Sequence, residues 1–321
     1  MSRWYLRGAL ALMLAMSLAL AGCATPPEES AAPQEPVAKE GPTVKVASLL
    51  DSEGVVLGSM VIKMLESEGI KTEDKTKFGT PDVVRKALLA GDVDASIDYT
   101  GSGQYYVGPE GDPMWKDPVK GYEQIKAEDA KNGLAWLTPS PANNGEYLAV
   151  TKEFADANKL VTMEDFAKFV NGGGTVKLVG DQSWMDNPAG LKAYETNYGF
   201  TLKPEQKIGL SNGVTAQFIE AVVKGTDGAN VAEVYATDGG LAEQGLVILT
   251  DSKNTPPVYA PTPVFRSQIV SAYPEIDSIL APIFQSLTTE KLQQLNREVA
   301  FGGKDGATVA EEYLKANGFL K

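Results

Sequence analysis

The sequence predicts an α/β fold, because short apolar runs alternate with helical patterns along most of the chain. Residues 44–50 are typical of a strand, and apolar residues at helical spacing follow until Gly69. Thr80-Pro81-Asp82 is typical of a second helix start, with a hydroxyl cap, an early proline and an acid in the first turn. Further strands are predicted at 93–97, 176–179, 231–235 and 246–249, and helices at 215–223 and 288–314 with a break near residues 302–303.

The N-terminus has the pattern of an export signal at residues 1–22. Arg3 and Arg7 precede an apolar run that is too short to span a bilayer comfortably. The run ends in Leu-Ala-Gly-Cys at residues 20–23, which resembles the lipobox of bacterial lipoproteins. This resemblance implies that Cys23 becomes an acylated N-terminus. The protein would then be periplasmic, or held on the outer face of the cytoplasmic membrane. The alternative is an ordinary signal peptide that contains a cysteine.

Residues 23–42 are predicted to be an extended tether. They hold five prolines with Ala, Ser, Glu and Gln, and almost no large apolar side chain that a fold could bury. The folded part therefore starts near residue 43 and runs to residue 321, a length that suits two domains or one large domain.

Composition excludes several function classes. The chain has no histidine, and Cys23 is its single cysteine, so imidazole and free-thiol catalysis are absent and no disulfide can form within the chain. We therefore expect no enzyme and no cofactor. The formal charge of −13 argues against a nucleic-acid partner and against a polybasic membrane patch.

Four blocks resemble the osmoprotectant-type family of substrate-binding proteins, which serve ABC importers of glycine betaine, choline, carnitine and related compounds. The most specific block is Gly-Asp-Val-Asp-Ala-Ser-Ile-Asp-Tyr-Thr-Gly at residues 91–101. The others lie at residues 46–54, at 137–144, and at 235–239 together with 257–261.

The resemblance implies a two-lobed, type II periplasmic-binding-protein-like fold with a ligand cleft between the lobes. Lobe 1 would comprise residues 43–142 plus 255–321, and lobe 2 residues 143–254. Closure of the lobes on a small-molecule ligand would be the signal that the permease subunits read. We expect a monomer.

Three tyrosines are the candidate cation site. A quaternary ammonium group has no N–H to donate, so aromatic faces and negative charge must hold it. The resemblance implies that Tyr99, Tyr235 and Tyr259, which follow predicted strands or lie in the fourth block, supply such faces. The alternative is that each tyrosine packs in a core with its hydroxyl bonded.

The candidate site departs from the family pattern. Leu49 stands where the family often has a lysine for the ligand carboxylate, and Asn187 is the nearest match to an arginine with the same role. A cage aromatic is replaced by Glu146, unless Tyr147 takes its place. Two neutral donors remain, Ser48 and Thr100. With Glu146 in the cage, choline should compete with glycine betaine at least equally; with Tyr147, an ordinary cage would form and Thr100 would help to hold the carboxylate.

Other aromatic residues are interpreted as core or lobe surface: Tyr105, Tyr106, Trp115, Tyr122 and Trp136. The alternating Asp92, Asp94 and Asp98 fit the exposed face of a strand better than a calcium loop. Three alternative functions stay open. They are binding of another cation or amino-acid derivative, a sensor lobe without transport, and an enzyme on the same two-lobed frame.

Overall fold

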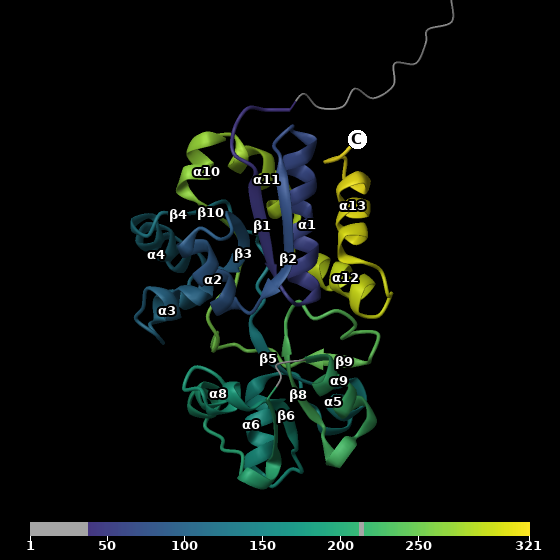
Figure 1. Cartoon of the computed structure of the whole chain (residues 1–321). Coiled ribbons are helices and arrows are strands. Elements are labelled where there is room, and N and C mark those ends of the chain that lie inside the picture. The colour runs from purple at the N-terminus through teal and green to yellow at the C-terminus, as the bar shows by residue number, and fades with distance from the viewer. Residues whose placement is uncertain (1–37, 212–214) are drawn as a thin grey trace, which may run out of the picture. The chain divides into compact units, whose positions relative to one another are not determined.

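The structure, a computed structural model, describes residues 38–211 and 215–321 (Figure 1). Cys23, the predicted signal and most of the predicted tether lie outside these residues. The described chain contains two five-stranded sheets with helices packed on them, which confirms the predicted α/β class. None of the helices in these two stretches is long and apolar enough to cross a bilayer.

The first sheet orders its strands as β2 (Thr72–Gly79), β1 (Val44–Leu49), β3 (Ala95–Tyr99), β10 (Pro261–Arg266) and β4 (Leu134–Trp136). Strand β1 is parallel to β2 and β3, whereas β10 is antiparallel to both of its neighbours. A late segment of the chain thus completes a sheet that an early segment begins.

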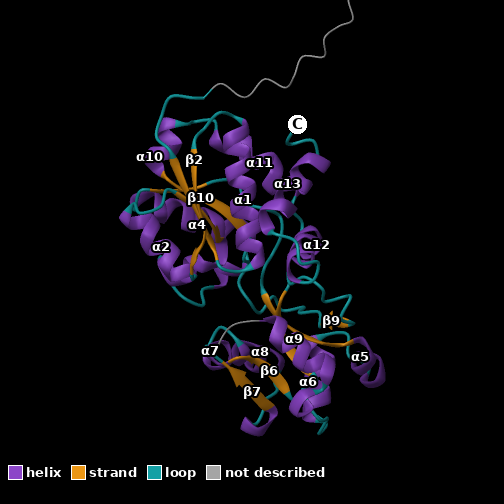
Figure 2. Ribbon diagram, turned by 45° about the vertical axis from the view of Figure 1, so that its right-hand side comes forward, coloured by secondary structure: helices purple, strands orange, loops and turns teal. Residues whose placement is uncertain are grey.

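Helices cover both faces of this sheet (Figure 2). One face packs against α1 (Ser52–Ser67), α11 (Ile276–Ser286), α12 (Thr289–Ala300) and α13 (Gly306–Ala316). The other face packs against α2 (Pro81–Ala90) and α4 (Pro118–Lys131), around the buried Trp115 and Trp136. We call this sheet and its helices lobe 1.

The second sheet orders its strands as β7 (Lys207–Leu210), β6 (Leu178–Asp181), β8 (Val231–Tyr235), β5 (Glu146–Thr151) and β9 (Leu246–Ile248). Its two faces pack against α6 (Met163–Asn171) with α8 (Leu191–Tyr198), and against α9 (Thr215–Lys224). Successive residues of β5 alternate between the two cores, as expected for a strand. We call this sheet and its helices lobe 2.

The chain crosses between the lobes at 137–145 and at 249–260, and α12 adds a third contact. The side-chain amide of Gln293 donates to the carbonyl of Ala236 at 2.6 Å. Gly239 lies so close to α12 that a Cβ there would be 2.3 Å from the backbone nitrogen of Arg297. Lobe 2 therefore rests on α12 through the residues that follow β8.

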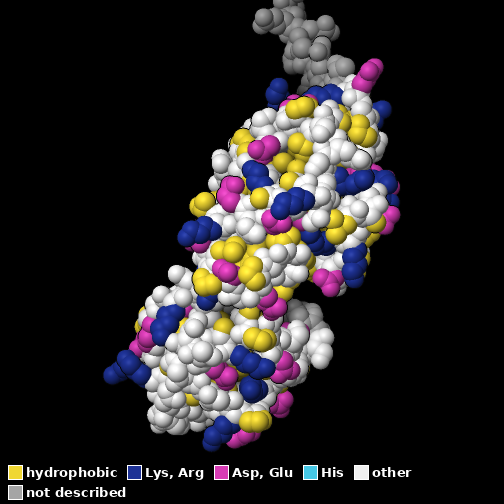
Figure 3. Space-filling view, turned by 90° about the vertical axis from the view of Figure 1, so that its left-hand side faces the viewer, with side chains coloured by type: hydrophobic (Ala, Val, Ile, Leu, Met, Phe, Trp, Pro, Cys, Tyr) yellow, Lys and Arg dark blue, Asp and Glu magenta, His cyan; other side chains and the backbone are white. Residues whose placement is uncertain are grey.

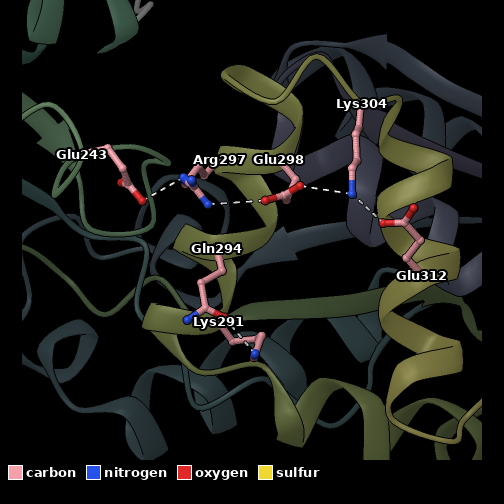
Figure 4. A network of polar contacts seen from close by, with 7 residues as sticks. All are labelled: Glu243, Lys291, Gln294, Arg297, Glu298, Lys304 and Glu312. Carbon is pink, nitrogen blue, oxygen red and sulfur yellow. Dashed lines mark hydrogen bonds and ion pairs between the residues drawn. The ribbon is translucent and has the colours of Figure 1, made fainter.

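Ion pairs extend this third contact across the surface (Figure 4). Arg297 pairs with Glu243 of lobe 2 at 2.8 Å and with Glu298 at 3.4 Å, and Lys304 bridges Glu298 and Glu312 at 3.1 and 2.8 Å. These side chains are partly exposed, so each pair contributes only about 0–1 kcal/mol. On the face shown in Figure 3, basic and acidic side chains are interspersed.

Several details differ from the sequence predictions. Strand β3 spans 95–99 rather than 93–97, and β6 spans 178–181 rather than 176–179. Asp94 is buried rather than exposed, because its carboxylate accepts from the backbone N–H of Lys45 at 3.1 Å and pairs with Arg266 at 3.3 Å.

Candidate ligand-binding site

Strand ends bring the three predicted tyrosines to the region where the lobes meet. Tyr99 ends β3 and Tyr235 ends β8, while Tyr259 lies just before β10. Tyr99 pairs in register with Pro261, so the end of β3 and the start of β10 lie side by side. The backbone N–H of Asn144, on one crossing segment, donates to the carbonyl of Tyr259 on the other at 2.9 Å.

Glu146 lies directly opposite Tyr235 in the antiparallel pair of β5 and β8. Residues opposite each other in such a pair share a face of the sheet, so the carboxylate and the ring are neighbours. Burial, with a smaller effect of Asp181, raises the pKa of Glu146 to about 7, even though a hydrogen bond with Tyr235 lowers it. Lobe 2 thus presents a carboxylate beside an aromatic ring.

Tyr147 takes the other face of β5. Its ring packs with the α9 side of the sheet and folds back towards Gly145. Its hydroxyl accepts a hydrogen bond from the amide of Asn143 at 3.2 Å. Because neighbouring residues of a strand point to opposite faces, Glu146 and not Tyr147 shares the face of Tyr235.

Tyr105, which the sequence analysis interprets as core or lobe surface, belongs to the same cluster. It lies in α3 (Gly103–Tyr106) of lobe 1 and is 50% exposed. Its hydroxyl forms hydrogen bonds with Tyr259 and with Asn187 of lobe 2. Burial raises the pKa of Tyr105, and these two bonds partly offset that rise. The amide of Gln104 donates to the hydroxyl of Tyr259 at 3.1 Å. The signal that could have identified Tyr105 is its position a few residues after the Tyr-Thr-Gly motif.

The remaining predicted donors have local partners. The hydroxyl of Ser48 donates to the carbonyl of Leu49 at 2.8 Å and accepts from the backbone N–H of Lys77 at 2.9 Å. The hydroxyl of Thr100 donates to the carbonyl of Val258 at 2.8 Å and accepts from Ala260 N–H at 3.1 Å. Both hydroxyls therefore join segments of lobe 1 and its crossing chain.

A cavity of about 380 Å³ opens beside this cluster, with lining residues from both lobes and from the second crossing segment. Its walls are Gln104, Glu110, Gly111, Asp112, Lys116, Pro188, Ala189, Ala193, Thr255 and Pro257. Gln104 belongs to both the cavity wall and the tyrosine cluster.

The charges that act on the cluster are negative. Burial raises the pKa of Tyr235 and of Tyr259, and Glu146 adds to both shifts. Burial, with a smaller effect of Glu146, raises the pKa of Glu233 to about 9. No group of three or more metal-ligating side chains occurs within 38–211 and 215–321 that could hold an ion. The arrangement can attract an organic cation and surround it with aromatic rings.

The chain matches known proteins over nearly all of its described length. Residues 42–316 match the family model described as the substrate binding domain of the ABC-type glycine betaine transport system. The chain is 41% identical over 279 residues to the glycine betaine-binding protein YehZ of Escherichia coli K12, covering 87% of this chain and 92% of that protein. It is 26% identical over 316 residues to the carnitine transport binding protein OpuCC of Listeria monocytogenes, covering 97% and 96%.

A solved structure agrees. Apo YehZ from Escherichia coli matches with a TM-score of 0.74 at 40% identity, over 87% of this chain and all of that chain. The predicted resemblance and the two-lobed fold are thereby confirmed. The relatives are substrate-binding proteins of transport systems and not enzymes. The chain belongs to the family of substrate-binding proteins of ABC-type glycine betaine transport systems.

Proposed function

We propose that the cleft binds a quaternary ammonium compound without a carboxylate, of the choline class, at least as well as glycine betaine. The observation that carries this proposal is the position of Glu146 beside Tyr235, with Tyr105 and Tyr259 also close to it. A cation gains from the carboxylate and from each aromatic face, by about 0.5–2 kcal/mol per desolvated ring. Tyr99 is buried against Glu53 and supports the cleft from lobe 1.

A ligand carboxylate finds weaker support in this site. An ionised group that leaves water needs charged or multiple donors. Leu49 offers none, and Asn187 offers a neutral amide whose oxygen already accepts from the backbone N–H of Ala189 at 2.8 Å. The cavity wall adds one cation, Lys116, together with two carboxylates, Glu110 and Asp112. Glu146 would repel the carboxylate when ionised. Glycine betaine, which the Escherichia coli relative's name gives as its ligand, should therefore bind this chain weakly.

Isothermal titration of the full chain with choline and with glycine betaine tests the proposal. Wild type should bind choline at least as tightly as betaine, and Glu146→Gln should weaken choline binding while weakening betaine binding less or improving it. Tyr147→Phe is the matched control, since it removes a polar group from the other face of β5. Tight betaine binding that Glu146→Gln leaves unchanged would refute the proposed preference. Binding of only another cation or an amino-acid derivative would support the alternative ligand class.

The second part of the proposal is that the mature protein starts at an acylated Cys23 and works as a lipid-anchored monomer on the outer face of the membrane. It rests on the Leu-Ala-Gly-Cys run after the apolar segment. Cys23→Ala should release the protein from membranes or block its processing. Intact-mass analysis of the wild-type protein without a lipid adduct would contradict this prediction.

A further inference from the structure

A buried carboxylate, that of Glu53, lies where both lobes meet. Glu53 is in the first turn of α1 and is 5% exposed. The hydroxyl of Tyr99 donates to its Oε1 at 2.7 Å, and the amide of Asn296, on α12, donates to its Oε2 at 2.8 Å. The amide of Asn144, on the first crossing segment, lies 3.4 Å from Oε1. The hydroxyl of Thr237, which follows β8 in lobe 2, lies within hydrogen-bonding reach of it.

The partners of Glu53 are bonded to one another as well. The hydroxyl of Thr237 donates to the side-chain oxygen of Asn144 at 2.8 Å, and the amide of Asn296 donates to the carbonyl of Thr237 at 2.8 Å. The contacts therefore form a closed ring that includes lobe 1, the crossing segment and lobe 2.

The backbone at Glu53 has little freedom to move. The carboxylate of Asp51 caps α1 by accepting from the backbone N–H of Gly54 at 2.7 Å. Gly54 packs against the end of β1, where a Cβ would be 3.0 Å from the backbone nitrogen of Leu49. A change in the charge of the Glu53 carboxylate should therefore move its hydrogen-bond partners rather than the backbone of α1.

The ring requires an acceptor at position 53. The side chains of Tyr99, Asn144 and Asn296 all present hydrogens to Glu53, and an ionised carboxylate can only accept. The side-chain oxygen of Asn296 has no partner within the described residues. Protonation would remove the charge that strengthens the hydrogen bonds from Tyr99, Asn144 and Asn296. The added hydrogen could go to the hydroxyl oxygen of Thr237, whose own hydrogen is donated to Asn144.

We propose that Glu53 is a positioning residue for ligand binding, whose ionised carboxylate fixes Tyr99 and, through Asn144 and Asn296, sets the angle between the lobes. Protonation of this carboxylate weakens the tie between α12 and lobe 2. The inference rests on the proposed function only for its choline readout, because the angle between the lobes can be measured without a ligand.

Burial places this switch near neutral pH. Burial, with a small effect of Asp51, raises the pKa of Glu53 to about 7, even though its hydrogen bonds lower it. The partners from the crossing segment, from α12 and from the residues after β8 are neutral amides and a hydroxyl. The charged residues next in sequence to Asn296 and Thr237 have other partners. Arg297 pairs with Glu243, and Asp238 accepts from the hydroxyl of Thr215 at 2.8 Å. The raised pKa of Glu53 is therefore due mainly to burial of its carboxylate.

The test measures the distance between the lobes by double electron–electron resonance in the full chain carrying Cys23→Ser. Spin labels at Val119→Cys in lobe 1 and Val161→Cys in lobe 2 use two exposed side chains, each 66% exposed. Without ligand, Glu53→Gln should broaden or shift the distance distribution and abolish its change between pH 6 and pH 8. In the same labelled chain, Glu53→Gln should weaken choline binding at least tenfold at pH 8. Glu243→Gln is the matched control, since it removes an exposed contact between the lobes, and it should change binding less than twofold.

Distances and a pH profile in Glu53→Gln that equal those of wild type would overturn the inference. If Glu53→Gln does not fold, Thr237→Val replaces it, because it removes the lobe 2 hydroxyl and leaves the carboxylate in place. Thr237→Val should then shift the distances, and unshifted distances would overturn the inference. Failure of wild type to bind choline would refute the proposed function, whereas the distance measurement would still decide the role of Glu53.

Discussion

Individual residues of the site serve two different purposes. Tyr99 and Glu53 are bonded to each other and nearly inaccessible, so their contribution is to hold the cleft in shape. Tyr105 is half-exposed and lies next to Tyr259 and Asn187, so it remains available to a ligand. We therefore expect substitutions of the first pair to alter geometry and substitutions of Tyr105 to alter contact.

Tyr105→Ala should weaken choline binding by about 0.5–2 kcal/mol, the contribution of one aromatic face to a cation. Tyr105→Phe keeps the ring and loses only the hydroxyl contacts, so it should retain most of the affinity. Both variants should unfold at nearly the wild-type urea concentration, because a half-exposed ring contributes little to the core. Calorimetric titration gives the affinities, and wild-type affinity in Tyr105→Ala would place this ring outside the ligand site.

At the scale of elements, helix caps give a controlled comparison. Thr162 and Asp165 form a capping box at the start of α6, with the Thr162 hydroxyl accepting from the Asp165 backbone N–H at 3.2 Å. Thr80 stands at the start of α2 but makes no side-chain cap bond. Thr162→Ala should therefore lower the free energy of unfolding by about 1 kcal/mol, and Thr80→Ala by clearly less. Urea denaturation followed by circular dichroism measures both, and equal losses would argue against the capping role.

The sequence predicts elements well where the signal is local. Strand β8 occupies 231–235 as predicted, and α2 starts after Thr80, because apolar period and turn chemistry act over a few residues. Strand β2 was not predicted, because Thr-Glu-Asp-Lys-Thr-Lys has no apolar face. It lies at the edge of its sheet, beside β1. Strand β10 was not predicted either, and it carries two prolines, Pro261 and Pro263, which are unfavourable within a strand.

The site was harder to predict than the fold. Its tyrosines were selected from motif positions, and the structure brings Tyr105 and Glu53 to them from positions without such a signal. A glutamate in the first turn of a helix is ordinary at sequence level, since it favours the helix dipole. The partners that make Glu53 unusual come from residues 144, 237 and 296, and only the folded chain brings them together.

At the scale of the whole molecule, several carboxyl groups hold protons more tightly when the chain is folded. Burial raises the pKa of Glu53 and Glu146 to about 7 and that of Glu233 to about 9. Asp129 behaves in the opposite way. Its bonds to Arg85 outweigh its burial and lower its pKa, so it makes stability rise with pH, but only at pH values below about 4.

We therefore expect the ligand-free protein to lose stability as the pH rises from 5 to 9. In this range the unfolded chain has released these protons and the folded chain still binds them, so the free energy of unfolding falls with pH. Each unit by which folding raises a pKa corresponds to about 1.36 kcal/mol in the free energy of unfolding, before structural relaxation and solvent screening reduce it. The melting temperature should fall accordingly, and the rise that saturating choline produces should be larger at pH 8 than at pH 6, because the cation then meets ionised carboxylates. A melting temperature that increases from pH 5 to pH 8 would contradict this prediction.

The place of β10 between β3 and β4 also determines the order in which the lobes can be completed. All strands of lobe 2 lie between residues 146 and 248, so that sheet can form as soon as this segment has been synthesised. Lobe 1 has to wait for residues 261–266, and meanwhile β3 and β4 lack the strand that joins them. Unpaired strand edges are prone to association with other chains. A ribosome or a translocation channel releases this chain from its N-terminus. The incomplete lobe 1 is therefore exposed for longer, and lobe 2 is the first unit that can fold completely.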